Sequence, residues 1–298
     1  MSVAHNEIES VAVVQPQRRS WWSRHGRSVT TYAAFVLFVL FVGFPFYFIV
    51  VSSITPRHEL FSIPPSYLPS SPTLDNYQRM IDAVPFTKYL RNSFIFAVGS
   101  AVVSVLVSAM AAYALARIKF PGSNVVYMLL ILSSALPQIA VLVPMFETFQ
   151  QFRLINTHQG LILLESSLIL PFTVLILVSF IMQIPGEIEE AALIDGANIV
   201  QVIIRMVFPL ILPALSTMTI INFIISWNEL LYPLVFAQRD NTKTLSVALI
   251  ELSSDASTYT RPWDMLSALS VFMVIPVLLL VLVGQRMIIA GLSRGAVK

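Results

Sequence analysis

The sequence predicts an all-α integral membrane protein with six transmembrane helices, and two observations carry this prediction. The chain is 56% hydrophobic and only 11% charged, whereas about 25% of the residues in a typical soluble domain are charged. Six runs of 21 to 29 residues contain no Asp, Glu, Lys or Arg, and about 20 apolar residues are enough for a helix to span a bilayer. Helices satisfy their own backbone hydrogen bonds in lipid, so they are the expected spanning structure.

The expected spans follow the charge-free runs in chain order. They cover residues 29–51, 94–116, 125–142, 161–184, 209–228 and 265–283. Five of them contain proline: Pro45, Pro137, Pro171 and Pro276 lie inside four spans, and Pro209 and Pro213 stand at the start of the fifth. The second span is rich in Gly, Ala and Ser, which allow helices to approach closely in lipid. We therefore expect the second span to pack in the interior of a bundle.

The segments outside the spans set the expected topology. Residues 1–28 form a basic tail with arginines around Trp21 and Trp22, a combination that suits the cytoplasmic membrane surface. The connection 55–92 is rich in proline and predicts an external loop with short helices, and the long connection 229–264 is external as well. An even number of spans then places both tails, 1–28 and 291–298, in the cytoplasm on either side of a six-span domain over 29–290.

Composition excludes several classes of function. The chain has no cysteine and its four histidines are scattered, so neither a disulfide framework nor a metal-ligand pattern is present. No glycine precedes a lysine, which excludes a Walker A phosphate loop. ATP hydrolysis that powered this chain would therefore take place on another subunit. The net charge of +2 gives no indication of nucleic acid binding.

The segment 185–208, between the fourth and fifth spans, is the most polar connection between two long apolar runs. Pro185 suits the start of a helix, and the following acidic residues, Glu187, Glu189 and Glu190, suit its positive N-terminal end. Gly196 can supply the left-handed residue that closes a helix. The sequence therefore predicts a short helix from Pro185 to Asp195, about 15 Å long.

This short helix has the pattern of a docking element. Ile188, Ala191, Ala192 and Asp195 fall at helical spacing, and we expect them to share one face. Two alanines in the middle of a face let another helix or backbone approach closely. The face therefore indicates a partner protein.

The segment as a whole resembles the EAA loop of ABC importer permeases. Glu-Ala-Ala at 190–192 recurs in many helices and is weak evidence alone, but here Asp195-Gly196-Ala197, Pro209 and Pro213 follow at the spacing of that family. Met206 and Phe208 replace the usual isoleucine and leucine and remain apolar. The resemblance extends from the first span onward and points to the carbohydrate branch of the family, to the smaller permease of the maltose type.

The resemblance implies a type I ABC importer permease fold and a set of partners. This chain would be the permease subunit of an ATP-driven sugar importer in the cell membrane of a bacterium or archaeon, and would form half of the translocation pathway through the lipid bilayer. The partners would be a second homologous permease, two ATPase subunits that carry ATP and Mg, and an extracellular or periplasmic sugar-binding protein. The ATPase-coupling residues would be Glu190, Ala191, Ala192, Asp195, Gly196, Ala197 and Pro209.

The same resemblance implies a functional role for two further segments, and each segment also has a simpler interpretation. The tail with Gly295 and Lys298 resembles the family's C-terminus, which reaches between the ATPase subunits, or it is a frayed end. In the external loop, Asn76, Tyr89 and Asn92 belong to strings that resemble sugar-importer permeases. The alternative is that these side chains only cap and fasten a surface helix.

Four residues are candidates for the substrate path: Glu165, Asn222, Trp227 and Asn228. An ionisable residue in a span indicates function, although Glu165 could instead lie hydrated near the outer interface. Amides beside an aromatic ring suit a neutral polyhydroxy ligand, although Trp227 could instead be an interfacial anchor. The spans contain no Lys or Arg, whereas a path for an anionic substrate would favour such a cation. The sequence therefore favours a neutral substrate.

Three other functions compete with a sugar permease. A permease for glycerol phosphate or another small polar solute is the closest alternative. A secondary transporter would ordinarily show more spans or ion sites in broken helices, and only Glu165 hints at such a site. An intramembrane enzyme would need paired acids, metal ligands or an activated nucleophile, and the sequence offers none of these. We therefore expect a transport component and not an enzyme.

Overall fold

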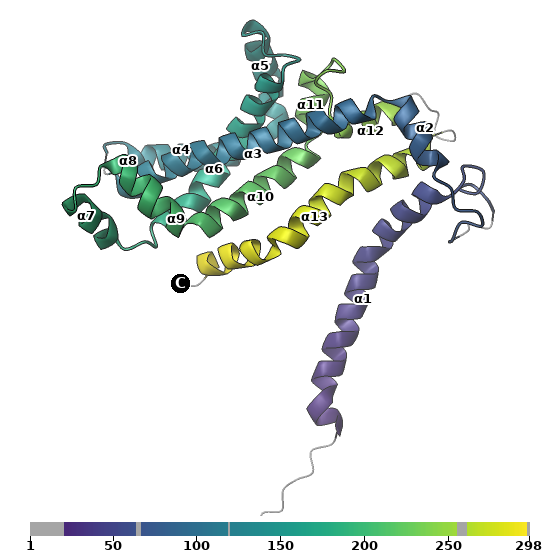
Figure 1. The fold of residues 1–298 in the computed structure, drawn as a ribbon, viewed down its shortest axis with the longest axis horizontal. Coiled ribbons are helices and arrows are strands. Elements are labelled where there is room, and N and C mark those ends of the chain that lie inside the picture. The colour runs from purple at the N-terminus through teal and green to yellow at the C-terminus, as the bar shows by residue number, and fades with distance from the viewer. Residues whose placement is uncertain (1–20, 64–66, 119, 255–260, 297–298) are drawn as a thin grey trace, which may run out of the picture. The chain divides into compact units, whose positions relative to one another are not determined.

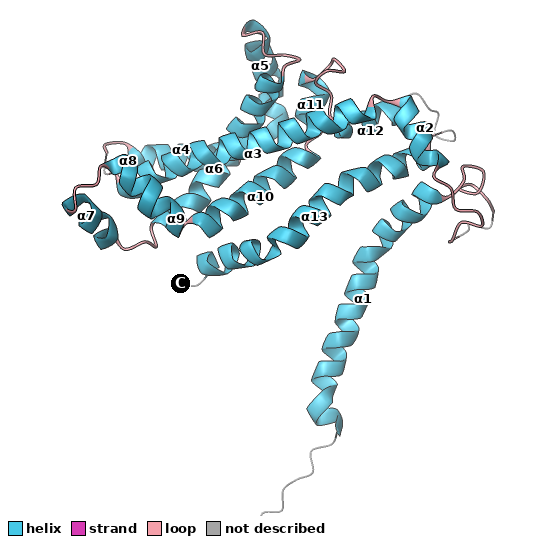
Figure 2. Cartoon of the chain, viewed as in Figure 1, coloured by secondary structure: helices cyan, strands magenta, loops and turns pink. Residues whose placement is uncertain are grey.

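The computed structural model describes residues 21–63, 67–118, 120–254 and 261–296, and within these ranges all regular structure is helical (Figure 2). The chain divides into two units, Met1–Phe48 and Ile49–Lys298. The described part of the first unit belongs to α1 (Trp21–Ile54), where Phe44 and Phe48 pack edge to face with ring centroids 4.8 Å apart. The second unit holds every other element. The basic tail expected over 1–28 falls mostly outside the described residues.

Four helical segments are long and apolar enough to cross a membrane: Thr30–Ile54 of α1, α3 (Phe86–Arg117), α6 (His158–Ile181) and Trp263–Gln285 of α13 (Trp263–Ala296). Two bent helix pairs pass the same test together. They are α4 (Ser123–Ser134) with α5 (Gln138–Gln151), and Ile199–Leu210 with α10 (Leu212–Asn228). If each pair is one span, the described residues contain six, and each expected span overlaps one of these segments.

Small side chains on α3 let its neighbours approach closely. Ser100, Ala101, Ser104, Ala109 and Ala112 are all buried, and a Cβ on Gly99 would lie 2.5 Å from Cδ1 of Ile162 on α6. The helices α3, α6 and α10 lie side by side along most of their length (Figure 1). The interior position expected for the second span is therefore observed.

The third expected span differs from the prediction because it is not one straight helix. It breaks before Pro137, and α4 and α5 meet at an angle of 103°. Proline has no N–H to donate and its ring clashes with the preceding turn, so a helix ends there readily. A second break, of 76°, stands at Ile211 between Pro209 and Pro213, after the π-helical segment η1 (Ile203–Val207) and the short helix α9 (Phe208–Leu210).

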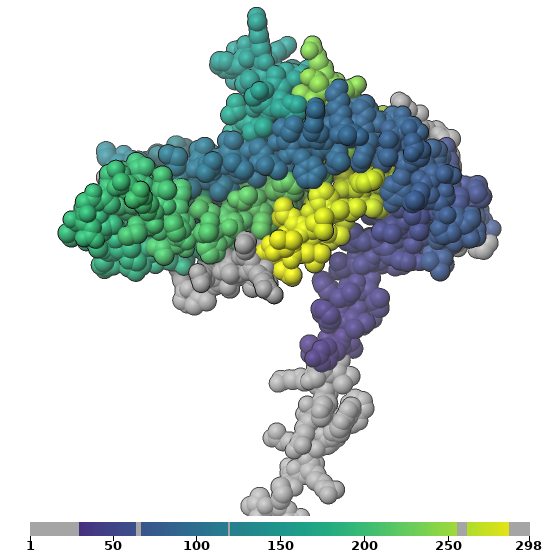
Figure 3. Space-filling view, in the orientation of Figure 1, coloured from purple at the N-terminus to yellow at the C-terminus, as the bar shows by residue number. Residues whose placement is uncertain are grey.

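The short elements gather at the two ends of the second unit (Figure 1). At one end lie α7 (Gly186–Ile194), α8 (Ile199–Val202) and α9 (Phe208–Leu210). At the opposite end lie α2 (Asp75–Ala83) and α12 (Leu245–Ser254). Figure 3 shows the same separation in the space-filling view. The helix α11 (Leu231–Phe236) packs beside α5 and α6.

Candidate functional site

The helix α7 forms where the acidic segment predicted one. Pro185 is the N-cap with φ −58°, and Glu187 and Glu189 stand in the first turn, where the helix dipole favours carboxylates. Asp195 is the C-cap, and Gly196 follows with φ +88°. A glycine adopts this left-handed conformation without the steric penalty of a Cβ, so the chain turns sharply away from the helix at Gly196.

The exposed side of α7 is smaller than the sequence predicted. Glu190, Ala191 and Asp195 are exposed, whereas Ala192 is only 5% exposed and packs inside the bundle near Tyr113 and Val202. The prediction that Ala191 and Ala192 share one partner-facing side is therefore wrong at Ala192. The close approach that Ala192 permits is made to its own chain.

The segment after α7 is rigidly built. Asn198 caps α8 reciprocally: its side chain accepts from the N–H of Gln201, and the Gln201 side chain accepts from the N–H of Asn198. Such a capping box satisfies two helix-end donors at once. Ala197 is half-buried, and Pro209 is exposed within α9. The predicted coupling residues therefore lie together at one end of the bundle (Figure 1).

Glu189 fastens α7 to the end of α3. Its Oε1 accepts from Nε of Arg117 at 2.7 Å, and its Oε2 accepts from the hydroxyl of Tyr113 at 3.0 Å. Arg117 also donates to the carbonyl oxygen of Ile184 at 2.6 Å. Glu189 is 7% exposed, so this carboxylate is paired inside the protein and is unavailable to a partner.

Asn222 lies at the centre of the bundle and ties three helices together. Its Nδ2 donates to Oγ of Ser104 on α3 at 2.9 Å and to Oγ1 of Thr173 on α6 at 3.0 Å. The residue is fully buried. Asn222 therefore meets its hydrogen-bonding needs within the protein, as polar side chains between membrane helices commonly do.

Trp227 and Asn228 have different surroundings although they are neighbours in sequence. Trp227 is 3% exposed, stacks on Phe223 and donates from Nε1 to the carbonyl oxygen of Met273 on α13 at 2.9 Å. It thus packs between α10 and α13, and not at an exposed interface. Asn228 is exposed and donates to Ile224 of its own helix at 2.8 Å.

Glu165 is buried in α6. It is 2% exposed, and Oγ of Ser226 on α10 donates to its Oε1 at 3.3 Å. The structure therefore does not show the hydrated interfacial position that the sequence left open. Glu165 bonds Ser226, the residue directly before Trp227 in α10, and Asn222 lies about one turn earlier on the same helix. The side chain of Asn228 is exposed, unlike the other three.

At the opposite end from α7, side chains of α3 fasten the connection that follows α11. The hydroxyl of Tyr89 donates to Oδ1 of Asp240 at 2.9 Å, Nδ2 of Asn92 donates to the carbonyl oxygen of Lys243 at 3.0 Å, and Oγ of Ser93 accepts from the N–H of Leu245 at 2.9 Å. The bonds from Tyr89 and Lys243 hold the pKa of Asp240 below its ordinary value. These bonds fasten the connection 237–244 to α3, and a functional role for Tyr89 and Asn92 stays a prediction.

The comparisons with known proteins decide the family. Residues 104–293 match the family model described as the binding-protein-dependent transport system inner membrane component. The chain belongs to this family. It is therefore a multi-pass membrane permease, a transport component and not an enzyme.

Two curated relatives resemble the permease over most of its length. The sulfoquinovosyl glycerol transport system permease protein SmoH of Agrobacterium fabrum is 33% identical and covers 97% of this chain and 99% of its own. The trehalose transport system permease protein SugB of Mycobacterium tuberculosis is 35% identical and covers 78% of this chain and 84% of its own.

Solved structures agree on the fold. A bacterial ABC transporter that imports the acidic polysaccharide alginate superimposes with a TM-score of 0.78 at 21% identity, and covers 90% of this chain and 98% of its own. A bacterial alginate ABC transporter in complex with an alginate pentasaccharide-bound periplasmic protein gives a TM-score of 0.67 at 16% identity, with 90% and 97% covered. The permease therefore has the type I ABC importer fold that the EAA-like loop implied.

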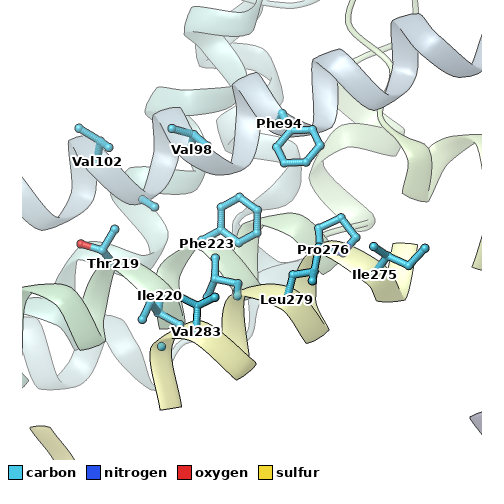
Figure 4. A pocket seen from close by; sticks show the side chains of 13 residues that line it. Phe94, Val98, Val102, Thr219, Ile220, Phe223, Ile275, Pro276, Leu279 and Val283 are labelled. Atoms are coloured by element: carbon cyan, nitrogen blue, oxygen red, sulfur yellow. The ribbon is translucent and has the colours of Figure 1, made fainter. Parts of the chain in front are cut away.

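A groove of about 720 Å³ runs between α3, α10 and α13 (Figure 4). Phe94 and Val98 line one side, Phe223 the second, and Pro276 and Leu279 the third. Thr219 supplies the single polar side chain among its lining residues, and that hydroxyl donates to the carbonyl oxygen of Leu215. The lining of this groove is therefore apolar, and its one hydroxyl is already bonded within its own helix.

Sequence reasoning missed Glu189, Arg117 and Tyr113 as one unit. The Glu-Ala-Ala string points to Glu190, whereas the sequence marks Glu189 only as one of three acidic residues at the start of a helix. Two signals were present: Arg117 ends a long charge-free run, and Glu189 stands three residues before Ala192, on the same side of the helix. Neither signal could show which charges meet, because they lie 72 positions apart.

Proposed function

We propose that this permease imports a sugar or a related carbohydrate. The observation that carries the proposal is the likeness to SmoH and SugB, both named for carbohydrate transport, over 97% and 78% of the chain. The charge of the substrate is a separate question. The charge-free runs leave no Lys or Arg in the membrane interior, and an anionic substrate would favour a cation on its path. SmoH is nevertheless named for a substrate that carries a sulfonate, so the uptake experiment below compares neutral with anionic solutes.

The proposed assembly contains this chain, a second homologous permease, two ATPase subunits and an external sugar-binding protein. ATP and Mg would bind to the ATPase subunits. The tail with Gly295 and Lys298 would reach between them; Gly295 belongs to the backbone of α13, and Lys298 lies outside the described residues. The membrane would place α7 and both tails in the cytoplasm, with α2 and α12 on the outside.

The proposed coupling element is the exposed side of α7, formed by Glu190, Ala191 and Asp195. Closure of the ATPase pair on ATP would move α7, and the helices attached to it would turn the pathway outward to receive sugar. Each ligand shifts this equilibrium only by the difference in its affinity for the two states. The end of the bundle that carries α7 must therefore contact the ATPase differently in each state.

The coupling role is tested by Glu190→Lys in the reconstituted complex. Reversal of an exposed charge at the docking surface is expected to leave membrane insertion intact and to abolish the ATP hydrolysis that the loaded binding protein stimulates. Glu147→Lys is the matched control, because Glu147 is also an exposed carboxylate but lies on α5, away from α7. Native stimulation in the Glu190 variant would refute the role proposed for α7.

The substrate class is tested by uptake into proteoliposomes that contain the complete complex. Trehalose and maltose serve as neutral sugars and glycerol 3-phosphate as the anionic competitor. ATP-dependent uptake of a sugar, competed by other sugars only, supports the proposal. Uptake of glycerol 3-phosphate in place of sugars would contradict the proposal and would indicate a glycerol phosphate permease. Ion-driven uptake by the purified chain without an ATPase would indicate a secondary transporter.

A further inference from the structure

The ion pair between Glu189 and Arg117 lies where α7 meets the rest of the permease. Along the chain, α7 is joined to α6 through the connection 182–185, which contains Pro185 and lies outside both helices. On its other side, Gly196 separates α7 from α8. The covalent chain by itself therefore links α7 to its neighbours only through two short non-helical segments.

Side-chain contacts close this gap. Arg117, the last residue of α3, reaches Glu189 at 2.7 Å and the carbonyl oxygen of Ile184 at 2.6 Å, so one guanidinium holds both α7 and its connection to α6. Tyr113, one turn earlier on α3, donates to the second oxygen of the same carboxylate. The planar guanidinium of Arg fixes two acceptors in a defined direction, which an ammonium would not do.

The clasp formed by Glu189, Arg117 and Tyr113 is shielded from water. The side chain of Glu189 is 9% exposed and that of Arg117 is 20% exposed. Ala192 on the same side of α7 packs in the apolar cluster that contains Tyr113 and Val202. A pair with so little solvent is weakly screened, and loss of either partner would leave an uncompensated charge in the protein.

Beyond the clasp, α3 is bonded to the centre of the bundle. Its Ser104 accepts from Asn222 of α10, which also donates to Thr173 of α6. A displacement applied to the exposed side of α7 therefore has a continuous path of buried contacts: through Glu189 into the end of α3, and from α3 into α6 and α10. Pro185 and Gly196 interrupt the path along the backbone. The apolar packing of Ala192 beside Val202 gives α7 a second contact with the bundle, but only the bonds of Glu189 fix it to α3 in a defined direction.

We propose that Glu189, Arg117 and Tyr113 are positioning residues that lock α7 to α3, so that movement imposed on α7 reaches the transmembrane bundle through α3. The inference rests on the proposed coupling role of α7 and adds the route by which the movement passes. Glu190 contacts the ATPase in this scheme, whereas Glu189 faces inward and contacts no partner.

The test uses the complete reconstituted complex and three variants: Glu189→Gln, Arg117→Gln and the exchanged pair Glu189→Arg with Arg117→Glu. The two single variants are expected to retain the ATPase subunits on purification. Their stimulated rate of ATP hydrolysis is expected to be about tenfold lower than that of the unaltered complex, an effect within the range for residues of coupling networks. The exchanged pair restores part of that loss, because the ion pair returns without the bonds to Tyr113 and Ile184. Glu147→Gln is the matched control and is expected to keep native stimulation, because Glu147 is an exposed carboxylate on α5, away from α7.

A cross-linking experiment tests the clasp if the substituted variants assemble poorly. The chain has no cysteine, so Glu189→Cys with Arg117→Cys offers a single pair of thiols for bifunctional reagents of graded length. Recovery of stimulated hydrolysis on cross-linking supports the clasp, since only attachment of α7 to α3 is restored. Failure of every cross-linked, assembled complex to recover would overturn it.

The results for the clasp variants and for Glu190→Lys distinguish the clasp from the coupling role of α7. Native coupling in both single variants, together with loss of coupling in Glu190→Lys, overturns the clasp and leaves the coupling role of α7 in place. Native coupling in Glu190→Lys as well removes that role, and the clasp with it.

Discussion

At the scale of single residues, buried polar side chains show how this permease uses hydrogen bonds inside lipid. Asn222 bonds α3 and α6 at once, Trp227 bonds α13, and Glu165 accepts from Ser226 across the interface between α6 and α10. An unsatisfied polar group in hydrocarbon is unfavourable, so each of these side chains selects a particular neighbour. Polar residues here specify which helices meet.

Asn222→Ala is therefore expected to destabilise the permease by about 1 kcal/mol, because it removes hydrogen bonds to two other helices in the membrane interior. Thermal unfolding of the purified protein in detergent measures the effect. Asn228→Ala is the matched control, since that amide is exposed and bonds only its own helix. An equal loss in both variants would contradict the structural role, and a raised KM for sugar in Asn222→Ala without a loss of stability would support the substrate-path role.

At the scale of elements, α7 depends on the residue that ends it. Gly196 has φ +88° and a Cβ there would meet nothing within 4 Å, so the conformation alone requires glycine. The sharp turn directs the chain from α7 into the capped helix α8. The position of the exposed carboxylates of α7 therefore follows from one backbone conformation.

Gly196→Ala is expected to destabilise the end of α7 by about 1 kcal/mol through left-handed strain and to lower stimulated ATP hydrolysis in the complex. Gly186→Ala is the control at the other end of the same helix, because its added Cβ also meets nothing and its φ is not positive. Alanine at position 186 is expected to be neutral or slightly stabilising. Equal effects at the two glycines would show that strain is not the cause.

The connection 237–244 is the second element whose position depends on a few bonds. Tyr89 and Lys243 hold the pKa of Asp240 below its ordinary value, and the bond to Glu251, at 2.5 Å, raises the pKa of Lys243. A lowered carboxyl pKa contributes stability that is present above the unfolded value, about 3.9, and is lost as the pH falls through the folded value.

Tyr89→Phe is expected to raise the pKa of Asp240 and to move the acid-induced release of this connection to higher pH. Hydrogen exchange over residues 237–252, measured from pH 7 to pH 3, follows the release directly. The unaltered protein should keep its protection down to about pH 4. A release that begins at the same pH in both proteins would show that the Tyr89 hydroxyl does not stabilise the charged carboxylate.

At the scale of the whole molecule, the second unit separates its exposed short elements by the length of the helical bundle. The 32 residues of α3 extend about 48 Å at the α-helical rise of 1.5 Å per residue, enough to cross a bilayer and its headgroup regions. The elements α7 and α2 lie at opposite ends of this length (Figure 1). A membrane around the bundle must place them on opposite sides.

Single cysteines at Leu74 and Ile194, both exposed, are therefore expected to react on opposite faces of the membrane. In intact cells, an impermeant maleimide should label Leu74→Cys and should label Ile194→Cys only after permeabilisation. Because the chain has no cysteine of its own, any labelling reports the introduced residue. Labelling of Ile194→Cys in intact cells would place α7 outside and remove the basis for its coupling role.

The sequence was sufficient for those features that depend on local composition. Charge-free runs located the six hydrophobic segments, because about 20 apolar residues match the bilayer whatever their neighbours. The acidic start and Gly196 located α7 because caps and dipoles act within one turn. It was insufficient at Pro137, where a proline inside a span can give either a kink or a complete break, and the outcome of 103° depends on the packing of α5 beside α11.

Residue composition by itself thus determined that the chain is a helical membrane protein, and the EAA-like string indicated the family that the comparisons show. Only the tertiary structure decided that Glu189 faces inward while Glu190 faces outward, that Asn222 bonds two other helices, and that Glu165 is buried. The physical reason is the separation along the sequence over which each interaction acts. Hydrophobic burial in lipid and helix capping are decided over neighbouring residues, whereas the partner of a charge or an amide is decided by which helices pack together, across 72 positions for Glu189 and Arg117 and 118 for Asn222 and Ser104.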